Sequence, residues 1–344
     1  MNAKPIIAIV TPVWNGMPFI KECVASVLSQ DFADWELLIS DNGSTDGTID
    51  YLLTLTDKRI KVFLQQENLG IMGNLNFLFL QVSAPITQIL CADDYLSSET
   101  SLRHISRYWK TAPNSLGFVT FKEQGWAAQV RSEAVALEDR IIPEVLPVGQ
   151  ADLWFFVCGN FIRNLSNVSL RTTIVRELGG FSEAFPAAGD FEFWVRASKN
   201  YAIGVKNQDL ICVRLHTRAA SNYLTMKGQV FEQLLAIYGQ LIQRLSPTHD
   251  IRQLQRYFNL TVCASYYYIG LKLILHGNFQ YLKTLFKANM FPAWSKWTLL
   301  VSCIPVTMVN RKQRLKVRLM KYMLSGSKIQ EKRASKKLLA NKLG

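Results

Sequence analysis

Short apolar runs alternate with polar loops and helical patterns over the first 100 residues of the chain. The apolar runs have the length of strands buried on both faces of a parallel sheet, and they cover residues 5–11, 35–40, 60–64 and 86–91. Helices are expected between them, over residues 18–30, 48–55 and 71–82. Strands that alternate with helices across short loops predict a doubly wound α/β sheet flanked by helices.

The second half of the chain first continues this pattern with shorter elements. We expect a strand over residues 166–170, helices over 172–178 and 189–198, and a last strand over 208–216. In the helix over 189–198, Phe191, Trp194 and Val195 recur at the spacing of one helix face. The last strand ends at His216, one of four histidines in the chain.

Polar residues follow the end of each of the first four strands, at positions 11–15, 41–46, 68–70 and 93–94. Right-handed crossovers bring the ends of such strands to one edge of the sheet. Four polar loops at one edge predict a site of the size of a nucleotide. The first strand is not followed by GxGxxG, and the chain has no GKS or GKT, so the standard dinucleotide and P-loop sites are not expected.

Asp93 and Asp94 stand directly after the fourth strand, where open α/β sheets place their ligands. Two adjacent carboxylates repel each other unless a cation lies close to them. Mg²⁺ and Mn²⁺ prefer oxygen ligands and often bind one or two carboxylates together with substrate phosphates. The pair therefore indicates either a cation site for a diphosphate or a solvated turn that caps the next helix.

Composition describes a chain that can bury a full core, with 344 residues, 49% of them apolar and 19% charged. Six scattered cysteines without a CxxC pair fit neither a disulfide framework nor a zinc cluster, and they suit a reducing compartment. The N-terminus lacks the apolar core of a signal peptide, so we expect a cytoplasmic protein. Residues 311–344 contribute +11 to the net charge of +13, which is thus a property of the C-terminal tail.

The composition shifts after residue 222 toward apolar and aromatic residues at helical spacing. The apolar stretches of this region are shorter than the 18–20 or so residues that span a bilayer, so packed or interfacial helices are expected. The tail carries four cations on one helix face: Arg311, Arg314, Arg318 and Lys321. A basic amphipathic helix fits an anionic membrane surface, and a solvated tail or a nucleic-acid arm is the alternative. We therefore expect three parts, residues 1–222, 223–310 and 311–344.

Several motifs occur together in order: TPVWNG after the first strand, then WELLISDNGSTDGT, QENLG and ILCADD. In these motifs the chain resembles the family 2 glycosyltransferases with the GT-A fold over about residues 5–218. The resemblance implies a mixed GT-A sheet followed by a mainly helical region. It also implies a nucleotide-diphosphate sugar donor, Mn²⁺ or Mg²⁺ as cofactor, and transfer with inversion.

By this resemblance, a first group of residues surrounds the nucleotide: Thr11, Pro12, Asn15, Asp41, Asn68 and Gly70. Within this group, Asp41 would contact the base. Asp93 and Asp94 match the DxD region of the family and would bind the metal, and Asp93 would also contact the donor. Cys91 stands where a common form of that motif has Asp, so Asp93 and Asp94 are the only carboxylates left in it.

The second half would supply the chemistry, again by resemblance. Gly180 lies in a GGF segment of the acceptor side, and Asp190 keeps the Asp of a Glu-Asp pair whose Glu is replaced by Gly189. Asp190 is the candidate general base, although an Asp at a helix start can also act only as a cap. Glu192 and Trp194 are further candidates for the acceptor side.

Arg214 and His216 match an Arg-x-His element of the family. His216 would bind the metal and Arg214 would lie near the donor phosphates, because the fork of a guanidinium suits phosphate oxygens. Without the resemblance, a histidine at a strand end is more often structural than a ligand.

These observations predict an inverting, metal-dependent glycosyltransferase of bacterial surface-polysaccharide assembly. The expected donor is a UDP-sugar, the acceptor is a glycan or a lipid-linked intermediate, and no nucleic acid is expected as a partner. The enzyme would lie at the inner face of the cell membrane and bind it through the tail. A sugar-1-phosphate nucleotidyltransferase and a non-catalytic binding protein of the same fold are the alternatives.

Overall fold

The computed structural model describes residues 5–122, 129, 130, 132–216, 229–274, 314 and 316–325. The chain forms two compact units. The first consists of residues 1–126, 142–151 and 162–217, and the second of residues 127–141, 152–161 and 218–344. Two short segments from the middle of the chain therefore join the C-terminal helices. The three-part division expected from the sequence stays a prediction.

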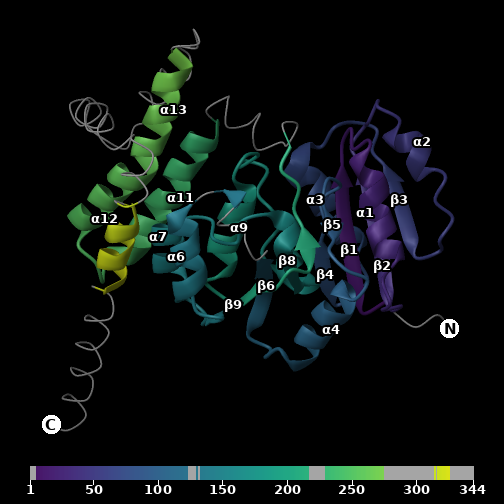
Figure 1. Ribbon diagram of the computed structural model, residues 1–344, viewed down its shortest axis with the longest axis horizontal. Coiled ribbons are helices and arrows are strands. Elements are labelled where there is room, and N and C mark those ends of the chain that lie inside the picture. The colour runs from purple at the N-terminus through teal and green to yellow at the C-terminus, as the bar shows by residue number, and fades with distance from the viewer. Residues whose placement is uncertain are drawn as a thin grey trace. The chain divides into compact units, whose positions relative to one another are not determined.

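The first unit is built on a mixed eight-stranded sheet in the order β3-β2-β1-β4-β8-β6-β9-β7. Its parallel half consists of β1 (Ile7–Val13), β2 (Trp35–Asp41), β3 (Ile60–Leu64) and β4 (Ile86–Ile89). Beyond β4 follow β8 (Val168–Arg171), β6 (Leu116–Lys122), β9 (Ala202–Asn207) and β7 (Val145–Leu146). Figure 1 shows this succession of strands, with β8 antiparallel to both of its neighbours.

Helices cover both faces of the sheet, as the alternation of apolar runs and helices predicts. Helices α1 (Phe19–Leu28) and α4 (Ser101–Thr111) share one apolar core with Ile7, Ile9 and Leu37 of the first strands. Helix α3 (Gly70–Gln81) packs on β1 and β2 and contacts α8 (Thr172–Glu177). Helices α2 (Thr48–Leu52) and α9 (Gly189–Ala197) complete the regular helices of this unit. The doubly wound mixed sheet expected from the sequence is thus confirmed.

The strand expected over residues 208–216 is wrong in extent. Only β10 (Ile211–Cys212) is extended, and it pairs with β5 (Tyr95–Leu96) in a separate two-stranded sheet. The last long strand of the main sheet is β9, which sequence reasoning missed. Gly204 weakens the apolar pattern of β9, yet a side chain there would meet the Tyr108 hydroxyl and the Val119 side chain at 2.3 and 2.9 Å.

The described part of the second unit is helical, as expected. It contains α6 (Glu133–Ile141), α7 (Asp152–Cys158), α11 (Gln229–Leu245), α12 (Ile251–Phe258) and α13 (Ala264–Ile274), with a π-helical turn over Asn259–Cys263 between the last two. Arg244 pairs with Asp152, and the Tyr257 hydroxyl donates to the Val157 carbonyl at 2.7 Å. Among the described residues, no helix is both long enough and apolar enough to cross a bilayer.

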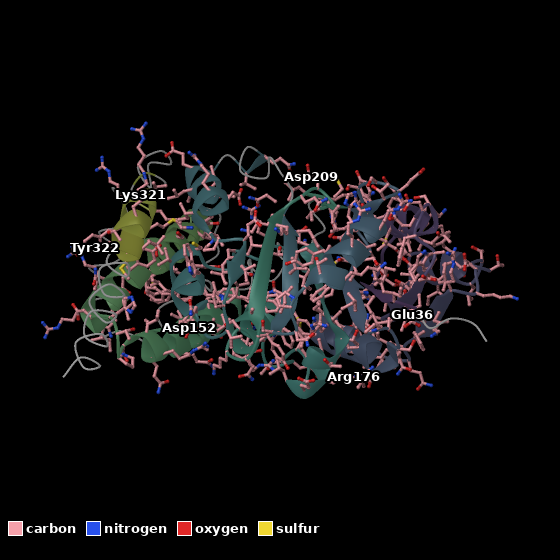
Figure 2. All side chains as sticks on the ribbon, turned by 90° about the horizontal axis from the view of Figure 1, so that it is seen from below. Glu36, Asp152, Arg176, Asp209, Lys321 and Tyr322 are labelled. Atoms are coloured by element: carbon pink, nitrogen blue, oxygen red, sulfur yellow. The ribbon has the colours of Figure 1, made fainter. Side chains whose placement is uncertain are left out.

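A last helix covers residues 316–325. Met320 and Met323 are buried, whereas Arg318 and Lys321 are exposed and Tyr322 is 62% exposed. Lys321 and Tyr322 are labelled on this helix in Figure 2. The helix is amphipathic as expected, but its two methionines are covered by protein and not left for a membrane. Arg311 and Leu315 lie outside the described residues.

Candidate functional site

The loops that follow β1 and β2 are joined by hydrogen bonds at one edge of the sheet. The Asn15 side chain accepts a bond from the Thr45 amide at 2.8 Å, and the Asn15 amide donates to the Ser44 hydroxyl at 2.7 Å. Asp46 accepts a bond from the Met17 amide at 2.9 Å. Asn15 has a φ of 50°, a conformation that Asn adopts more readily than most residues. The first two loops therefore form one bonded surface.

The loop after β3 joins this surface through Asn42. The side-chain nitrogen of Asn42 donates to the side-chain oxygen of Asn68 at 2.8 Å. The side-chain oxygen of Asn42 accepts a hydrogen bond from the backbone amide of Leu69, also at 2.8 Å. Gly70 has a φ of 72° at the start of α3, and its amide also bonds to Asn68 at 2.8 Å. The structure thus brings together the predicted nucleotide residues Asn15, Asn68 and Gly70.

Asp41 lies at the end of β2 and is completely buried. Its Oδ1 accepts bonds from the amides of Gly43 and Ser44 at 3.1 and 2.8 Å, whereas its Oδ2 is buried without a hydrogen-bond partner in the described part of the chain. A buried acceptor without a donor is costly unless a ligand supplies one. The predicted contact of Asp41 with a base stays a prediction, since the side chain is as buried as that of Thr11.

Thr11 and Pro12, which were also assigned to the nucleotide, belong to strand β1 itself. Thr11 is completely buried, so it supports the edge from within the sheet. Trp14, which sequence reasoning did not single out, is 60% exposed directly beside Asn15. A large aromatic ring is a natural stacking partner for a base. Its position in the loop after the first strand was the signal that could have identified it.

Asp93 lies in a turn that directly follows β4. The Asp94 amide closes this turn by donating to the Cys91 carbonyl at 3.0 Å. The ligand atoms of Cys91, Asp93 and Asp94 lie within 4.8 Å of one another. The Asp93 side chain is 35% exposed, and its Oδ2 lies 2.9 Å from Nε2 of His216. The structure therefore joins Asp93 to the histidine that the sequence assigned to the same site.

The short ladder between β5 and β10 explains how residues so distant in sequence meet. The ladder is antiparallel and pairs Cys212 with Tyr95, so the residues that follow Cys212 run back alongside those that precede Tyr95. The Arg214 amide donates to Asp94 Oδ1 at 2.9 Å, and its guanidinium donates to the Asp93 carbonyl at 2.9 Å. Arg214 also pairs with Glu22 and lies over the Tyr95 ring at 4.6 Å.

Burial and like charge shape the electrostatics of this turn. Burial, and then the negative charge of Asp93, raise the pKa of Asp94 to about 7. Burial, and then the charge of Asp94, hold the pKa of Cys91 well above its usual range. Sulfur is moreover a soft ligand, whereas Mg²⁺ and Mn²⁺ prefer oxygen, so the Cys91 thiol is poorly suited to such a cation. A carboxylate and an imidazole nitrogen remain, and this set fits Mn²⁺ or Mg²⁺ when phosphate oxygens complete it.

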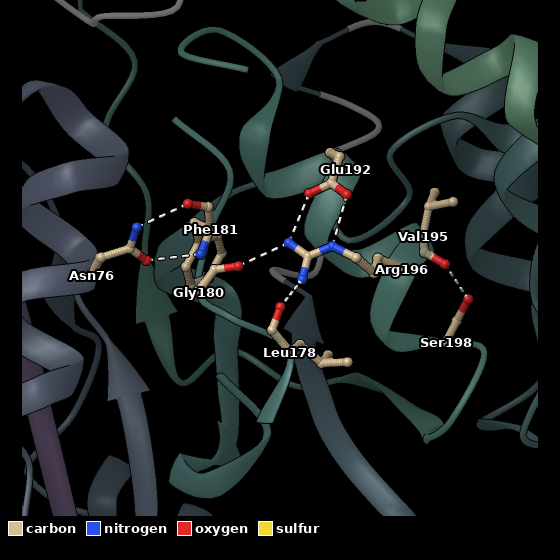
Figure 3. Close-up of polar contacts among 8 residues, drawn as sticks. All are labelled: Asn76, Leu178, Gly180, Phe181, Glu192, Val195, Arg196 and Ser198. Atoms are coloured by element: carbon tan, nitrogen blue, oxygen red, sulfur yellow. Dashed lines mark hydrogen bonds and ion pairs between the residues drawn. The ribbon is translucent and has the colours of Figure 1, made fainter. Parts of the chain in front are cut away.

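The segment over residues 178–181 follows helix α8, and Figure 3 shows the polar contacts that hold it. The Asn76 side chain binds both backbone groups of Phe181, at 2.8 Å to the carbonyl and 2.7 Å to the amide. Arg196 donates to the carbonyls of Leu178 and Gly180. Gly180, a predicted acceptor-side residue, is therefore held between α3 and α9 by these two side chains.

Helix α9 carries the other residues assigned to the acceptor side. Asp190 lies in its first turn and is half-buried. The Glu192 carboxylate is bound by two nitrogens of Arg196, at 2.8 and 2.9 Å. Trp194 is completely buried and packs against Phe118. Trp194 therefore supports α9 from the core and cannot reach an acceptor, because its apolar helix face is turned toward the sheet.

The mixed sheet, with three bonded loops and an acidic turn at one edge, places the protein in the α/β class, whose ligands bind beyond the carboxyl ends of the strands. Residues 8–166 match the model of the family described as Glycosyl transferase family 2. This segment is somewhat less than half of the chain, and its match identifies the protein as a glycosyltransferase by enzyme class. The match favours this enzyme class over the nucleotidyltransferase and the non-catalytic protein.

Known proteins of similar sequence or fold agree with this assignment. An uncharacterized glycosyltransferase of Haemophilus influenzae is 25% identical over 64% of this chain and 69% of its own length. The Escherichia coli UDP-Glc:alpha-D-GlcNAc-diphosphoundecaprenol beta-1,3-glucosyltransferase WfgD is 33% identical over 26% of this chain and 35% of its own length. The structure of the mannosyltransferase PcManGT from Pyrobaculum calidifontis, in complex with GDP-Man and Mn²⁺, matches with a TM-score of 0.55 and 15% identity over 95% of this chain and 87% of that one. This likeness supports the GT-A fold alone.

Proposed function

We propose that the protein transfers a sugar from a UDP-sugar to a hydroxyl group of its acceptor, with inversion at the anomeric carbon and with Mn²⁺ or Mg²⁺ as cofactor. The observation that carries the proposal is the pairing of Asp93 with His216 at the edge of the sheet that also bears the bonded nucleotide loops. Such an edge accommodates both parts of a donor, the nucleoside and the diphosphate.

The residues at this edge of the sheet would contribute to donor binding in different ways. Asp93 and His216 would hold the cation, which supplies charge neutralisation for the departing diphosphate. The unpartnered Oδ2 of Asp41 accepts a hydrogen bond from the base, and Trp14 offers its ring for stacking. Arg214 keeps the acidic turn in place and contributes positive charge close to the phosphates.

Asp190 acts as the general base in this proposal. Its position in the first turn of α9 favours the ionised carboxylate, because the positive end of the helix dipole lies there. An ionised carboxylate can take the proton of the acceptor hydroxyl as that oxygen attacks the sugar. Glu192, by contrast, is engaged by Arg196, and it serves the acceptor side by holding the segment 178–181 through that arginine.

The acceptor is proposed to be a lipid-linked glycan of surface-polysaccharide synthesis, presented at the cytoplasmic face of the membrane. The name of the relative WfgD specifies a UDP-sugar donor and a diphosphoundecaprenol acceptor. Arg314, Arg318 and Lys321 are exposed on the C-terminal helical segment and suit an anionic surface. Because Met320 and Met323 are buried, this contact would be electrostatic and would not depend on insertion of the helix.

The proposal is tested with purified protein and a panel of nucleotide sugars. We expect slow, Mn²⁺-dependent hydrolysis of one UDP-sugar, faster transfer to a lipid-diphosphate sugar, and loss of both when EDTA removes the metal. Asp190→Asn should still bind UDP and Mn²⁺ and lose transfer, since the amide cannot accept the proton. Transfer by this variant at more than a few per cent of the normal rate would remove Asp190 as the base. Turnover that EDTA leaves unchanged would contradict the metal dependence.

A further inference from the structure

Ser166 lies next to the acidic turn, in the short 3-10 helix Leu165–Asn167 that precedes β8, and it is completely buried. Its hydroxyl oxygen lies 2.8 Å from the Cys91 amide and 2.6 Å from Asp94 Oδ2. Its own amide donates to the Asn164 side chain at 2.7 Å, which fixes the serine backbone. Ser166 therefore contacts both ends of the turn that carries Asp93.

The direction of these hydrogen bonds follows from the chemistry of the groups. A backbone amide can only donate, so the Ser166 oxygen accepts from Cys91. The single hydroxyl proton is then free to point at Asp94 Oδ2, which is an acceptor. A bond from a hydroxyl to a carboxylate is among the stronger hydrogen bonds in proteins.

Both carboxylate oxygens of Asp94 thus accept hydrogen bonds from the protein. Oδ1 accepts from the Arg214 amide at 2.9 Å and Oδ2 from Ser166, and the residue is only 1% exposed. Asp93, in contrast, has a side chain that is 35% exposed and lies beside the His216 imidazole. The two adjacent carboxylates thus have different surroundings, one a buried anchor and the other an accessible ligand.

We propose that Ser166 is a positioning residue of the cation site, acting through Asp94 and the Cys91 peptide to hold Asp93 toward a divalent ion. This inference rests on the cation binding in the proposed function. The turn is closed at its base by the bond from the Asp94 amide to the Cys91 carbonyl, and Ser166 bridges the same two residues a second time. A doubly bridged turn leaves Asp93 little freedom to rotate away from His216.

The expected size of the effect comes from comparable supports in metal sites. Removing a group that orients a metal ligand typically costs 10–100-fold in metal affinity. Ser166→Ala removes the donor to Asp94 and the acceptor for Cys91 while leaving Asp93 and His216 unchanged. We therefore expect the Kd for Mn²⁺ to rise roughly 10–100-fold in this variant.

The experiment is a titration of the full-length protein with Mn²⁺, in which the free ion is followed by electron paramagnetic resonance, with and without UDP. Ser169→Ala is the matched control. Ser169 is also a completely buried serine, three positions further on, and its hydroxyl bonds to Trp109 at 2.8 Å and not to the acidic turn. This control should bind Mn²⁺ within about threefold of the original protein, while Asp93→Asn should abolish binding.

A second pair of variants tests whether Ser166 acts through Asp94 and guards against a folding defect in Ser166→Ala. Asp94→Asn should weaken Mn²⁺ binding by about as much as Ser166→Ala, and the double variant by no more than either single one. Unchanged affinity in Ser166→Ala, an equal loss in Ser169→Ala, or additive losses in the double variant would each overturn the inference. If Asp94→Asn abolished binding as Asp93→Asn does, Asp94 would be a direct ligand and the inference would also fall. Failure of the original protein to bind Mn²⁺ even with UDP would overturn the proposed metal dependence itself.

Discussion

Gly180 offers a sharp test of how the segment over residues 178–181 is held. It follows helix α8 with a φ of 81°, and a Cβ built on it would lie 2.7 Å from Oδ1 of Asn76. Gly179 has nearly the same φ, 76°, and apart from its chain neighbours no atom of the described residues lies within 4 Å of its added Cβ. The two neighbouring glycines thus share the backbone requirement and differ in their surroundings. Gly179→Ala is therefore a matched control for Gly180→Ala.

The expected losses in stability have two contributions, the strain of the backbone and the loss of hydrogen bonds. Alanine in the left-handed region costs about 1–2 kcal/mol at either position. In Gly180→Ala the new methyl group also displaces Asn76, which loses its two hydrogen bonds to the Phe181 backbone. Each of these bonds is worth about 1 kcal/mol. We therefore expect a loss of stability of about 1–2 kcal/mol for Gly179→Ala and of about 3–4 kcal/mol for Gly180→Ala.

Hydrogen exchange followed by mass spectrometry measures the opening free energy of peptides that cover β8 and α9. In an Asn76→Ala background the clash is gone, so Gly180→Ala should cost only the backbone strain and match Gly179→Ala. Equal losses for the two glycine variants with Asn76 present would refute the reasoning. So would a Gly180→Ala cost that Asn76→Ala leaves unchanged.

Three further predictions concern other parts of the chain. Burial alone would raise the pKa of Glu36, but bonds from Lys61 and Ser83 lower it overall below 4.5. Glu36→Gln should therefore destabilise the protein by about 2 kcal/mol at pH 7, and urea unfolding should show this difference vanishing as the pH falls below 4.5. Trp14→Ala should weaken UDP binding by roughly tenfold in calorimetry while Trp14→Phe retains it; equal affinities would exclude stacking. Replacing Arg314, Arg318 and Lys321 with Glu should abolish salt-sensitive co-sedimentation with phosphatidylglycerol vesicles, and unchanged sedimentation would locate membrane binding elsewhere.

The fold of the first unit could be predicted where apolar runs were unbroken. The strands β1 to β4 and the helices between them match the expected positions within a few residues. Strand β9 was not predicted because Gly204 interrupts its apolar pattern. Its pairing with β6 also joins residues that are far apart in the sequence. Local patterns also could not show that residues 127–141 and 152–161 belong to the second unit, because periodicity reveals that a helix has an apolar face but not which core receives it.

The residues of the candidate site that directly follow a strand could be predicted from the sequence. Asp93 and His216 meet as expected, because one follows β4 and the other follows the ladder of β10 with β5. Ser166 was missed because a lone serine carries no motif and its partner Asp94 lies 72 positions away. Glu192 could have been linked to Arg196 by their spacing of four residues, which places them on one helix face.

The ladder of β5 with β10 also determines when the proposed cation site can first form during protein synthesis. Asp93 and His216 are 123 positions apart. At roughly 5–20 residues per second, a ribosome needs on the order of 6–25 s to make the chain between them. The nucleotide loops are complete by Gly70, well before that interval begins. A nascent chain therefore carries Asp93 and Asp94 for several seconds or more without Arg214 and His216. A chain released before His216 would have the three bonded loops but not the complete proposed cation site.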